Sequence, residues 1–399
     1  MSSMKSPLAV VRKPSEYSEN AFSEVTECLE TAVREGVFPG CVLLVGSRGV
    51  ELYKHAFGVK ALPRNEQEEA LTMQADTVFD IASVTNVMVT TTLIMQLMEL
   101  GRLRLDDRVS RYIHGFGVFG KSAITIRQVL SHTSGLSHWH PYFEELLKVN
   151  SAVRRGIMTS RGAKEFVYNS INRCQLKWEP GARQMYSDLG FMLLGHLIEV
   201  STGLKLDKAA QRYLFQPLGL RATSYIDLTL IRRRGIHPVR DLIAPTEDCP
   251  WRRRMLCGEV HDDNAWAMGG IAGHSGIFTT VNDLHVFAAE MLRAYLGRSA
   301  FLKQETVRHF WNAGRSAPIE GWRYGWDSPS KENGLAESRL SKNAVGINGF
   351  TGCSLWLEPE MGLEIILLSN RIHPSRSNKK IRLFRPQLID AVIAAVERL

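Results

Sequence analysis

The sequence has little that would hold a metal through cysteine or cross a membrane. Its six cysteines show no C-x-x-C spacing, and no apolar run is long enough to span a bilayer. Residues 1–12 carry only a short apolar stretch and no small-residue cleavage site. We therefore expect reduced thiols, no bound metal or other cofactor, and a soluble cytoplasmic protein without a membrane span.

The signs of a nucleic-acid-binding protein are also missing, although the formal net charge is +8. Basic residues gather at 232–234, at 252–254 and between 371 and 385, without interleaved aromatic residues or a known binding module. Such clusters usually form solvated surface, so we expect no nucleic-acid partner. The alternative for these clusters is a basic rim that attracts an anionic substrate.

What the 399 residues do contain is enough apolar material for a large core, because 44% of them are hydrophobic. Both ends of the chain show a helical pattern next to a pair of β-rich runs separated by turn residues. The expected helices cover 21–35 and 386–399, and the expected hairpins cover 41–46 with 50–57 and 354–358 with 363–368. These segments predict one antiparallel sheet flanked by the N- and C-terminal helices.

The middle of the chain reads as mostly helical. A capping box at Thr125 predicts a helix that Gly135 closes, and further helices are expected at 188–200 and from Thr280 to Leu296. The fold class is therefore α/β, an antiparallel sheet with an inserted helical region. We expect a short extension and one domain, divided as follows: extension 1–20, domain 21–399, sheet region about 21–80 and 276–399, helical region about 81–275.

One short motif determines how the function is interpreted. Residues 79–86 read Phe-Asp-Ile-Ala-Ser-Val-Thr-Asn and precede an apolar helical stripe, so Ser83 should lie at the start of a helix. Residues three apart share a helix face, and a lysine at position 86 would be placed to take the proton of the serine. Position 86 is Asn, and an amide is not a base. Ser83 alone could equally be a helix N-cap.

Further segments match one known family in order along the chain. They are 130–136 (Leu-Ser-His-Thr-Ser-Gly-Leu), 186–190 (Tyr-Ser-Asp-Leu-Gly), 217–220, 258–264 (Gly-Glu-Val-His-Asp-Asp-Asn), 269–276 and 349–352 (Gly-Phe-Thr-Gly). With residues 79–85, these segments resemble the serine β-lactamase-related family, which includes class C β-lactamases, D-alanyl-D-alanine peptidases and esterases. The resemblance implies a β-lactamase/transpeptidase-like fold from about residue 22 to the C-terminus.

The resemblance also implies roles for single residues. Ser83 corresponds to the acylated nucleophile, Tyr186 to the tyrosine that helps to move its proton, and Asp188 to the Asn or Asp that binds the lysine and the substrate. The third motif of the family aligns with Ile347, Asn348 and Gly349. The backbone N–H groups of Ser83 and Phe350 would form the oxyanion hole.

Two departures from the family pattern affect the same proton transfer. Asn86 replaces the lysine of the first motif, and Ile347 replaces the lysine or histidine of the third. A tyrosine with a pKa near ~10 and no cation beside it is protonated at neutral pH and is a poor base. Losing a positioned base typically costs about 10²–10⁴ in rate. We therefore expect an impaired enzyme.

The histidines near these motifs differ in their expected roles. His274, between glycines, is the best candidate for a replacement acid or base. His132 and His196 read as structural, and His261 with its two neighbouring aspartates lacks further ligands at metal spacing. The residues 138–140 either line the entrance of the cleft or form a surface loop.

The sequence is compatible with three functions. The first is weak or altered ester or amide hydrolysis through Ser83. The second is a catalytically inactive pseudoenzyme that binds a peptide-like or acyl ligand or a partner protein. The third, a cell-wall penicillin-binding enzyme, is disfavoured by the lost lysine and the absent export signal. The expected ligand is a small acyl, ester or peptide-like molecule, and the oligomeric state is not indicated.

Overall fold

The computed structural model describes residues 20–63, 67–152, 156–313 and 321–399, and its centre is a six-stranded sheet. The strand order is β3-β2-β1-β11-β10-β9, and all neighbouring pairs are antiparallel. The strands are β1 (Gly40–Ser47), β2 (Val50–Ala61), β3 (Leu71–Thr72), β9 (Val345–Asn348), β10 (Ser354–Glu358) and β11 (Leu363–Ser369). Because β1 pairs with β11, the two predicted hairpins join into one sheet, which confirms the expected fold class.

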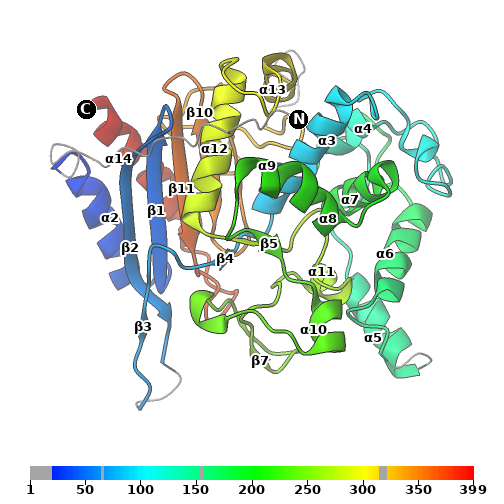
Figure 1. Cartoon of the computed structure of the whole chain (residues 1–399), viewed down its shortest axis with the longest axis horizontal. Helices are drawn as coiled ribbons and strands as arrows, with labels where there is room; N and C mark the ends of the chain where they lie inside the picture. Colours follow the sequence, from blue (N-terminus) through cyan, green and yellow to red (C-terminus); the bar gives the residue numbers. More distant parts are fainter. Residues whose placement is uncertain (1–19, 64–66, 153–155, 314–320) are drawn as a thin grey trace, which may run out of the picture.

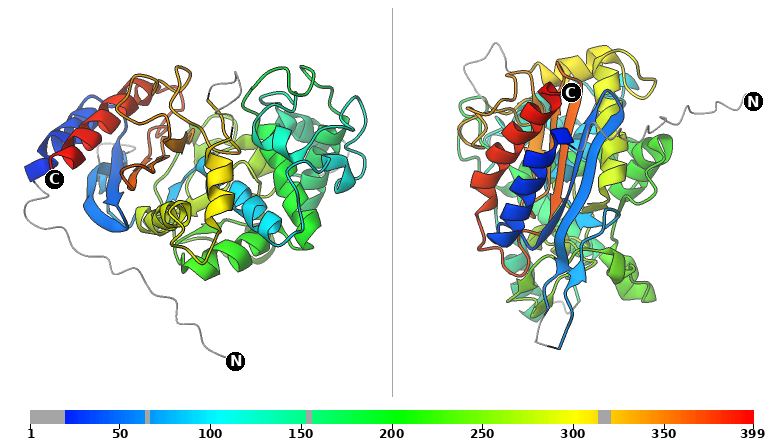
Figure 2. Two further views of the ribbon diagram at one scale, coloured as in Figure 1. Left: turned by 90° about the horizontal axis from the view of Figure 1, so that it is seen from above. Right: turned by 90° about the vertical axis from the view of Figure 1, so that its left-hand side faces the viewer.

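Helices cover both faces of this sheet (Figures 1 and 2). α2 (Ser23–Arg34) and α14 (Ile381–Glu397) lie side by side on one face, and α12 (Val281–Tyr295) lies on the other. The side chains of β1 alternate between the two layers, as the period of a strand requires. Leu43 and Val45 pack in the core under α2 and α14, whereas Val42 and Leu44 belong to the larger core on the opposite face.

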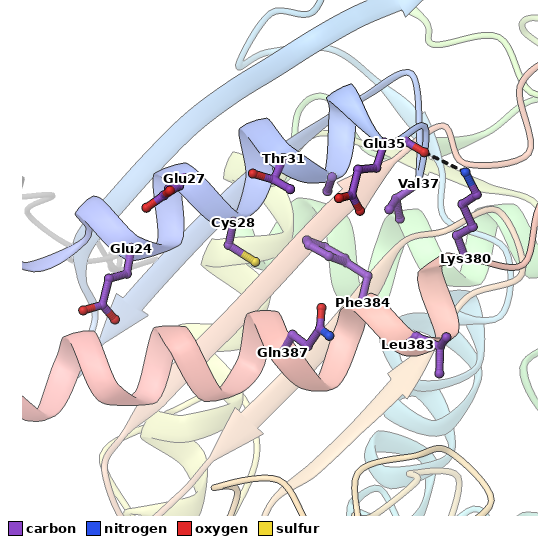
Figure 3. Close-up of a pocket in the computed structure, with 11 residues that line it drawn as sticks. Glu24, Glu27, Cys28, Thr31, Glu35, Val37, Lys380, Leu383, Phe384 and Gln387 are labelled. Atoms are coloured by element: carbon purple, nitrogen blue, oxygen red, sulfur yellow. Dashed lines mark hydrogen bonds between the residues drawn. The ribbon is translucent and has the colours of Figure 1, made fainter.

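A groove of about 550 Å³ separates α2 from α14 (Figure 3). Cys28 and Phe384 line it, together with the acidic side chains of Glu24 and Glu27 in α2 and of Glu35 just after it. At one end the Lys380 ammonium donates a hydrogen bond to the main-chain oxygen of Glu35 (2.7 Å). This contact ties the first turn of α14 to the C-terminal end of α2.

The remainder of the chain forms the helical region and two small sheets. Its helices are α3 (Thr92–Glu99), α4 (Ile126–Leu130), α5 (Tyr142–Ala152), α6 (Arg161–Arg173), α7 (Asp188–Thr202), α8 (Leu206–Ala210), α9 (Gln216–Leu218), α10 (Leu228–Arg234), α11 (Asp263–Ala267) and α13 (Gln304–Trp311), with the π-helices η1 (Asn86–Thr91) and η3 (Gln211–Phe215) and the 3₁₀ turns η2 (Val109–Arg111) and η4 (Arg240–Leu242). The small sheets are β4-β8-β5 and β6-β7, built from β4 (Phe79–Asp80), β5 (Ser224–Tyr225), β6 (Asp248–Cys249), β7 (Arg254–Met255) and β8 (Ile277–Thr279).

Local sequence signals placed most helix starts correctly. The capping box at Thr125 is present, and the Thr280 hydroxyl accepts a hydrogen bond from a first-turn N–H of α12. Two boundaries were wrong. α4 ends at Leu130, before Gly135, and α14 begins at Ile381 and carries Pro386 inside its second turn.

Two expectations concern how the chain divides into an extension and regions of one domain. The predicted extension 1–20 lies, apart from its last residue, outside the described residues, and the division into sheet and helical regions stays a prediction.

Within the described ranges no single helix has the length and apolarity to cross a bilayer. The bent pair Asp188–Thr202 and Leu206–Leu218 meets these two criteria only when its helices are counted together.

Candidate active site

Ser83 stands on a sharp turn between the short strand β4 and a helix. Ala82 before it has a φ of +45°, a conformation that is strained for any residue with a side chain. The Asp80 carboxylate holds this turn by accepting hydrogen bonds from the N–H groups of Ala82 (2.9 Å) and His261 (2.7 Å). The helix then starts as predicted, but Asn86 opens it as a turn of π-helix before α3.

The hydroxyl of Tyr186 connects Ser83 to Asn86. It lies 3.1 Å from the Ser83 Oγ and accepts a hydrogen bond from the Asn86 Nδ2 (3.0 Å). The Oδ1 of Asn86 is buried and has no hydrogen-bond partner among the described residues. The three side chains that the sequence motifs nominated are therefore in one network, with the Asn86 amide in it as a donor.

Burial and charge make Tyr186 a neutral phenol. Burial, followed by the charge of Asp188, raises its pKa well above the usual 10. The hydrogen bond that Tyr186 donates to Ser83 and the one it accepts from Asn86 offset this rise only in part. The Asp188 carboxyl lies near the Tyr186 hydroxyl, because each group shifts the pKa of the other. Burial raises the pKa of Asp188 above its ordinary value, and the positive charge of His274 opposes that rise. Asp188 is thus a carboxyl of increased basicity that lies near the tyrosine next to Ser83.

His274 lies in the same site and forms a pair with Asp262. Its Nε2 is 2.9 Å from the Asp262 Oδ1, while its buried Nδ1 has no partner within the described residues. Burial lowers the pKa of His274, but the Asp262 carboxylate outweighs burial and the net direction is upward. The pKa of Asp262 is about 2, because the His274 charge and a hydrogen bond from the Ala265 N–H overcome its burial. Within this pair, His274 lowers the pKa of Asp188 and Asp262 raises it, and the effect of His274 is the larger.

Two backbone N–H groups without an acceptor stand close to Ser83. Neither the Ser83 nor the Phe350 N–H makes a hydrogen bond within the part of the chain that the structure describes. The turn after β9 packs directly against the segment before Ser83, because a Cβ on Gly349 would lie 2.6 Å from the Ile81 oxygen. The Thr351 hydroxyl donates to the Asp80 oxygen (2.7 Å) and fixes this contact. The arrangement suits an oxyanion hole.

Arginine side chains hold the same turn from behind. The Arg371 Nε donates to the Phe350 oxygen (3.0 Å), and its guanidinium lies 4.8 Å from the centre of the Phe350 ring. The His261 ring stacks on Phe350 at 5.5 Å. The Arg385 Nη2 donates to the oxygens of Gly349 (3.2 Å) and Cys353 (3.1 Å). The direction of the Phe350 N–H therefore depends on these contacts.

These groups surround a cavity of about 1000 Å³. All the nominated site residues line it except Asn86, which is buried behind Tyr186. They are Ser83, Tyr186, Asp188, His274, Asn348, Gly349 and Phe350. His138 and Trp139, from the loop expected either at the cleft entrance or on the surface, line it as well. Ile347 is absent from this lining and is packed in the hydrophobic core at 1% exposure.

The other histidines have structural surroundings. The His132 Nδ1 accepts a hydrogen bond from the Ser187 N–H (3.1 Å), and burial lowers its pKa to about 3. His196 stacks on Tyr168, and His261 pairs with Glu247 at 3.1 Å. Among the described residues no three His, Cys, Asp or Glu side chains gather in a way that could hold a metal ion.

The basic residues between 371 and 385 line one wall of this cavity, where the alternative of a basic rim for an anionic substrate requires them. A residue not expected from the sequence is Asp327, which lines the cavity and whose pKa burial raises to about 7. No local motif marks Asp327, because its environment is created by distant segments.

Comparison with known proteins agrees with this geometry. A family model described as Beta-lactamase matches residues 25–387. The chain is 30% identical over 392 residues to an N-acetylmuramyl-L-alanine amidase of Bacillus subtilis (strain 168), covering 92% of this chain and 85% of that protein. It is 29% identical over 361 residues to a putative D-alanyl-D-alanine carboxypeptidase of Escherichia coli (strain K12), covering 84% and 79%.

Solved structures share the fold at lower identity. EstCE1, a hydrolase with promiscuous acyltransferase activity, superimposes with a TM-score of 0.71 at 21% identity, covering 95% of this chain and all of that one. The octameric penicillin-binding protein homologue from Pyrococcus abyssi gives 0.68 at 18% identity, covering 95% and 77%. These structures share the fold, and the family match over residues 25–387 shows that the chain belongs to the β-lactamase family.

Proposed function

We propose that the protein is a serine hydrolase that forms an acyl-enzyme at Ser83 and hydrolyses esters or amides more slowly than a relative with lysine at position 86. The observation that carries this proposal is the 3.1 Å contact between the Ser83 Oγ and the Tyr186 hydroxyl at the wall of the cavity. Asp188, a carboxyl with a raised pKa, lies near Tyr186. The three residues form a path for a proton that does not need position 86.

In the first half-reaction the Ser83 Oγ attacks the carbonyl carbon of the ligand. The serine proton passes to the Tyr186 oxygen while Tyr186 gives its own proton to the ionised Asp188. The phenol stays neutral overall, so its high pKa is not an obstacle. The carbonyl oxygen becomes an oxyanion and accepts hydrogen bonds from the N–H groups of Ser83 and Phe350.

When the tetrahedral intermediate collapses to the acyl-enzyme, Asp188 returns its proton through Tyr186 to the leaving oxygen or nitrogen. In the second half-reaction a water molecule gives a proton along the same path to Asp188 and attacks the ester carbonyl at Ser83. The bond from the carbonyl carbon to the Ser83 Oγ then breaks, Asp188 returns the proton through Tyr186 to the Ser83 Oγ, and the carboxylic acid leaves. Asp188 needs to be ionised at the start of each half, and the positive charge of His274 favours that form.

The absence of a cationic side chain at positions 86 and 347 limits the rate of the proposed hydrolysis. Asn86 donates a hydrogen bond to the Tyr186 oxygen, but it neither takes a proton nor carries a charge. Ile347 is buried in the core and supplies no charge to the cavity. A loss of about 10²–10⁴ relative to a lysine-bearing site is typical of an absent general base. Activated esters, whose leaving groups need no proton, should be the best substrates.

The second candidate function is binding of an acyl or peptide-like ligand without turnover. It is favoured by the hydrogen bond from the Asn86 Nδ2, which occupies the Tyr186 oxygen. If the Tyr186 hydrogen then points to the Ser83 Oγ, the serine receives a hydrogen bond instead of giving up its proton. The cavity and its lining would serve this function equally well.

Hydrolysis of a chromogenic ester distinguishes the two candidates. We expect the wild type to exceed the uncatalysed rate and Ser83→Ala to abolish the excess. Ser134→Ala is the matched control, because Ser134 is a buried serine that does not line the cavity. Excess turnover that survives Ser83→Ala would remove Ser83 from the reaction. A wild type that binds a substrate-like ligand without turning it over would support the binding function.

A further inference from the structure

One wall of the cavity carries several cations that form no ion pair with a described residue. Of the basic side chains on this wall, Arg376 is paired, with its Nε 2.8 Å from the Glu247 Oε1 and its Nη1 3.2 Å from the Asp263 Oδ2. The remaining five make no ion pair with any described residue. They are Lys331, Arg371, Lys379, Arg382 and Arg385.

Two of these guanidinium groups are buried with only neutral partners. Arg385 is 9% exposed, and its Nε finds no acceptor in the described structure. The contacts of Arg371 go to main-chain oxygens of Phe350, Arg376 and Asn378. Burial, and then the charge of a neighbouring arginine, lower the pKa of each to about 10, and the Glu247 carboxylate opposes this shift for Arg371, so both remain charged at neutral pH. Holding such charges together without an ion-pair partner is unfavourable.

The N-terminus of α14 faces the same space. This 17-residue helix has no side-chain cap and no acidic residue in its first turn, and the Ile381 N–H has no acceptor within the described ranges. The contact of Lys380 with Glu35 turns that side chain away toward α2 (Figure 3). Arg382 and Arg385 are three residues apart on the helix, and both line the cavity. The helix dipole adds to their positive potential.

We propose that Arg382, Arg385 and the first turn of α14, with Arg371 behind them, form a subsite for a phosphate group of the ligand. A carboxylate would neutralise one of these charges, whereas a phosphate dianion neutralises more and offers three strong acceptor oxygens. The subsite adjoins Gly349 and Phe350, so the phosphate would lie on the β9 side of the carbonyl that Ser83 attacks. That the phosphate belongs to an acyl ligand rests on the proposed function, while the binding of phosphate does not.

Calorimetric titration with inorganic phosphate at constant ionic strength tests the subsite, with acetate as the comparison anion. Arg382→Met is the main variant, because Arg382 is exposed and makes no ion pair among the described residues. Loss of one charge-assisted contact should weaken phosphate binding about 10-fold or more. Arg233→Met, which removes an exposed arginine of α10, is the matched control and should bind phosphate like the wild type.

Arg385→Lys is a second variant, because it keeps the positive charge but has fewer N–H donors for the main-chain oxygen of Gly349. Its phosphate affinity should fall less than that of Arg382→Met, with circular dichroism confirming the fold. Equal affinity in the wild type and Arg382→Met, or acetate binding as tight as phosphate, would overturn the proposal. Ser83→Ala should bind phosphate normally. Phosphate binding without ester turnover would leave the subsite standing and remove the hydrolase, and turnover without phosphate binding would do the opposite.

Discussion

Substituting Asn86 by lysine should restore a base to the site. The Asn86 Nδ2 is 3.0 Å from the Tyr186 hydroxyl, which is 3.1 Å from the Ser83 Oγ. A lysine extends further than an asparagine from the same Cα, so its amine should reach the space between Tyr186 and Ser83. We expect ester hydrolysis to rise by about 10²–10⁴ in kcat/KM, the usual contribution of a positioned general base.

The new side chain enters a tightly packed position. Asn86 has 0% exposure, so a lysine there is partly desolvated and displaces its neighbours. The carboxyl of Asp188 acts on Tyr186, the neighbour of Asn86, and favours a positive charge in this network. We expect a net destabilisation of about 1–3 kcal/mol, which is small compared with the 5–15 kcal/mol that holds a typical domain folded.

Steady-state hydrolysis of a p-nitrophenyl ester is the assay. Asn86→Gln is the matched control, because it lengthens the side chain without adding a base and should stay at the wild-type rate. Combining Asn86→Lys with Ser83→Ala should remove the gain. A folded Asn86→Lys variant that is no faster than Asn86→Gln would show that the absence of lysine does not limit the reaction.

The remaining predictions concern the proton path through Tyr186 and Asp188 and the buried carboxyl of Asp327. Tyr186→Phe should lower kcat by about 10²-fold or more with little change in KM, because a positioned proton carrier is lost; an unchanged kcat would remove Tyr186 from the path. The wild-type rate should rise with pH until Asp188 is ionised and then level off, and Asp188→Asn should lose both this limb and most of the activity; a pH profile that survives in Asp188→Asn would contradict the relay. Because the pKa of Asp327 is raised from 3.8 to about 7, the unfolded chain ionises first, and stability should fall by roughly 4 kcal/mol between these pH values. Urea unfolding of Asp327→Asn should show a flatter pH dependence, and equal slopes in both proteins would contradict the assignment.

Much of the fold follows from local patterns. The two hairpins were predicted because alternating apolar residues end at clear turn residues, and the structure joins them through the pairing of β1 with β11. The C-terminal helix was placed too late because proline favours the first turn of a helix, whereas Pro386 lies further inside α14. The π-helical turn at Asn86 has no signature in the sequence, since it depends on the packing around the Ser83 turn.

Local sequence patterns predicted the candidate site only in part. Ser83 and Tyr186 are 103 residues apart, and only the resemblance of their motifs suggested that they meet. Their hydrogen-bond distance follows from the fold, but their catalytic roles stay predictions. The proximity of Tyr186 to Asp188 and the arginines behind Phe350 could not be anticipated, because burial and long-range packing decide both. Spacing along the chain carries no information on desolvation.

The most direct test of the account is covalent labelling of Ser83. Intact-protein mass spectrometry after incubation with a fluorophosphonate should show a single adduct on the wild type, located at Ser83 by peptide mapping. The adduct should be absent from Ser83→Ala and should form faster on Asn86→Lys. A folded wild type that stays unmodified, or an adduct that persists in Ser83→Ala, would contradict the claim that Ser83 is a working nucleophile.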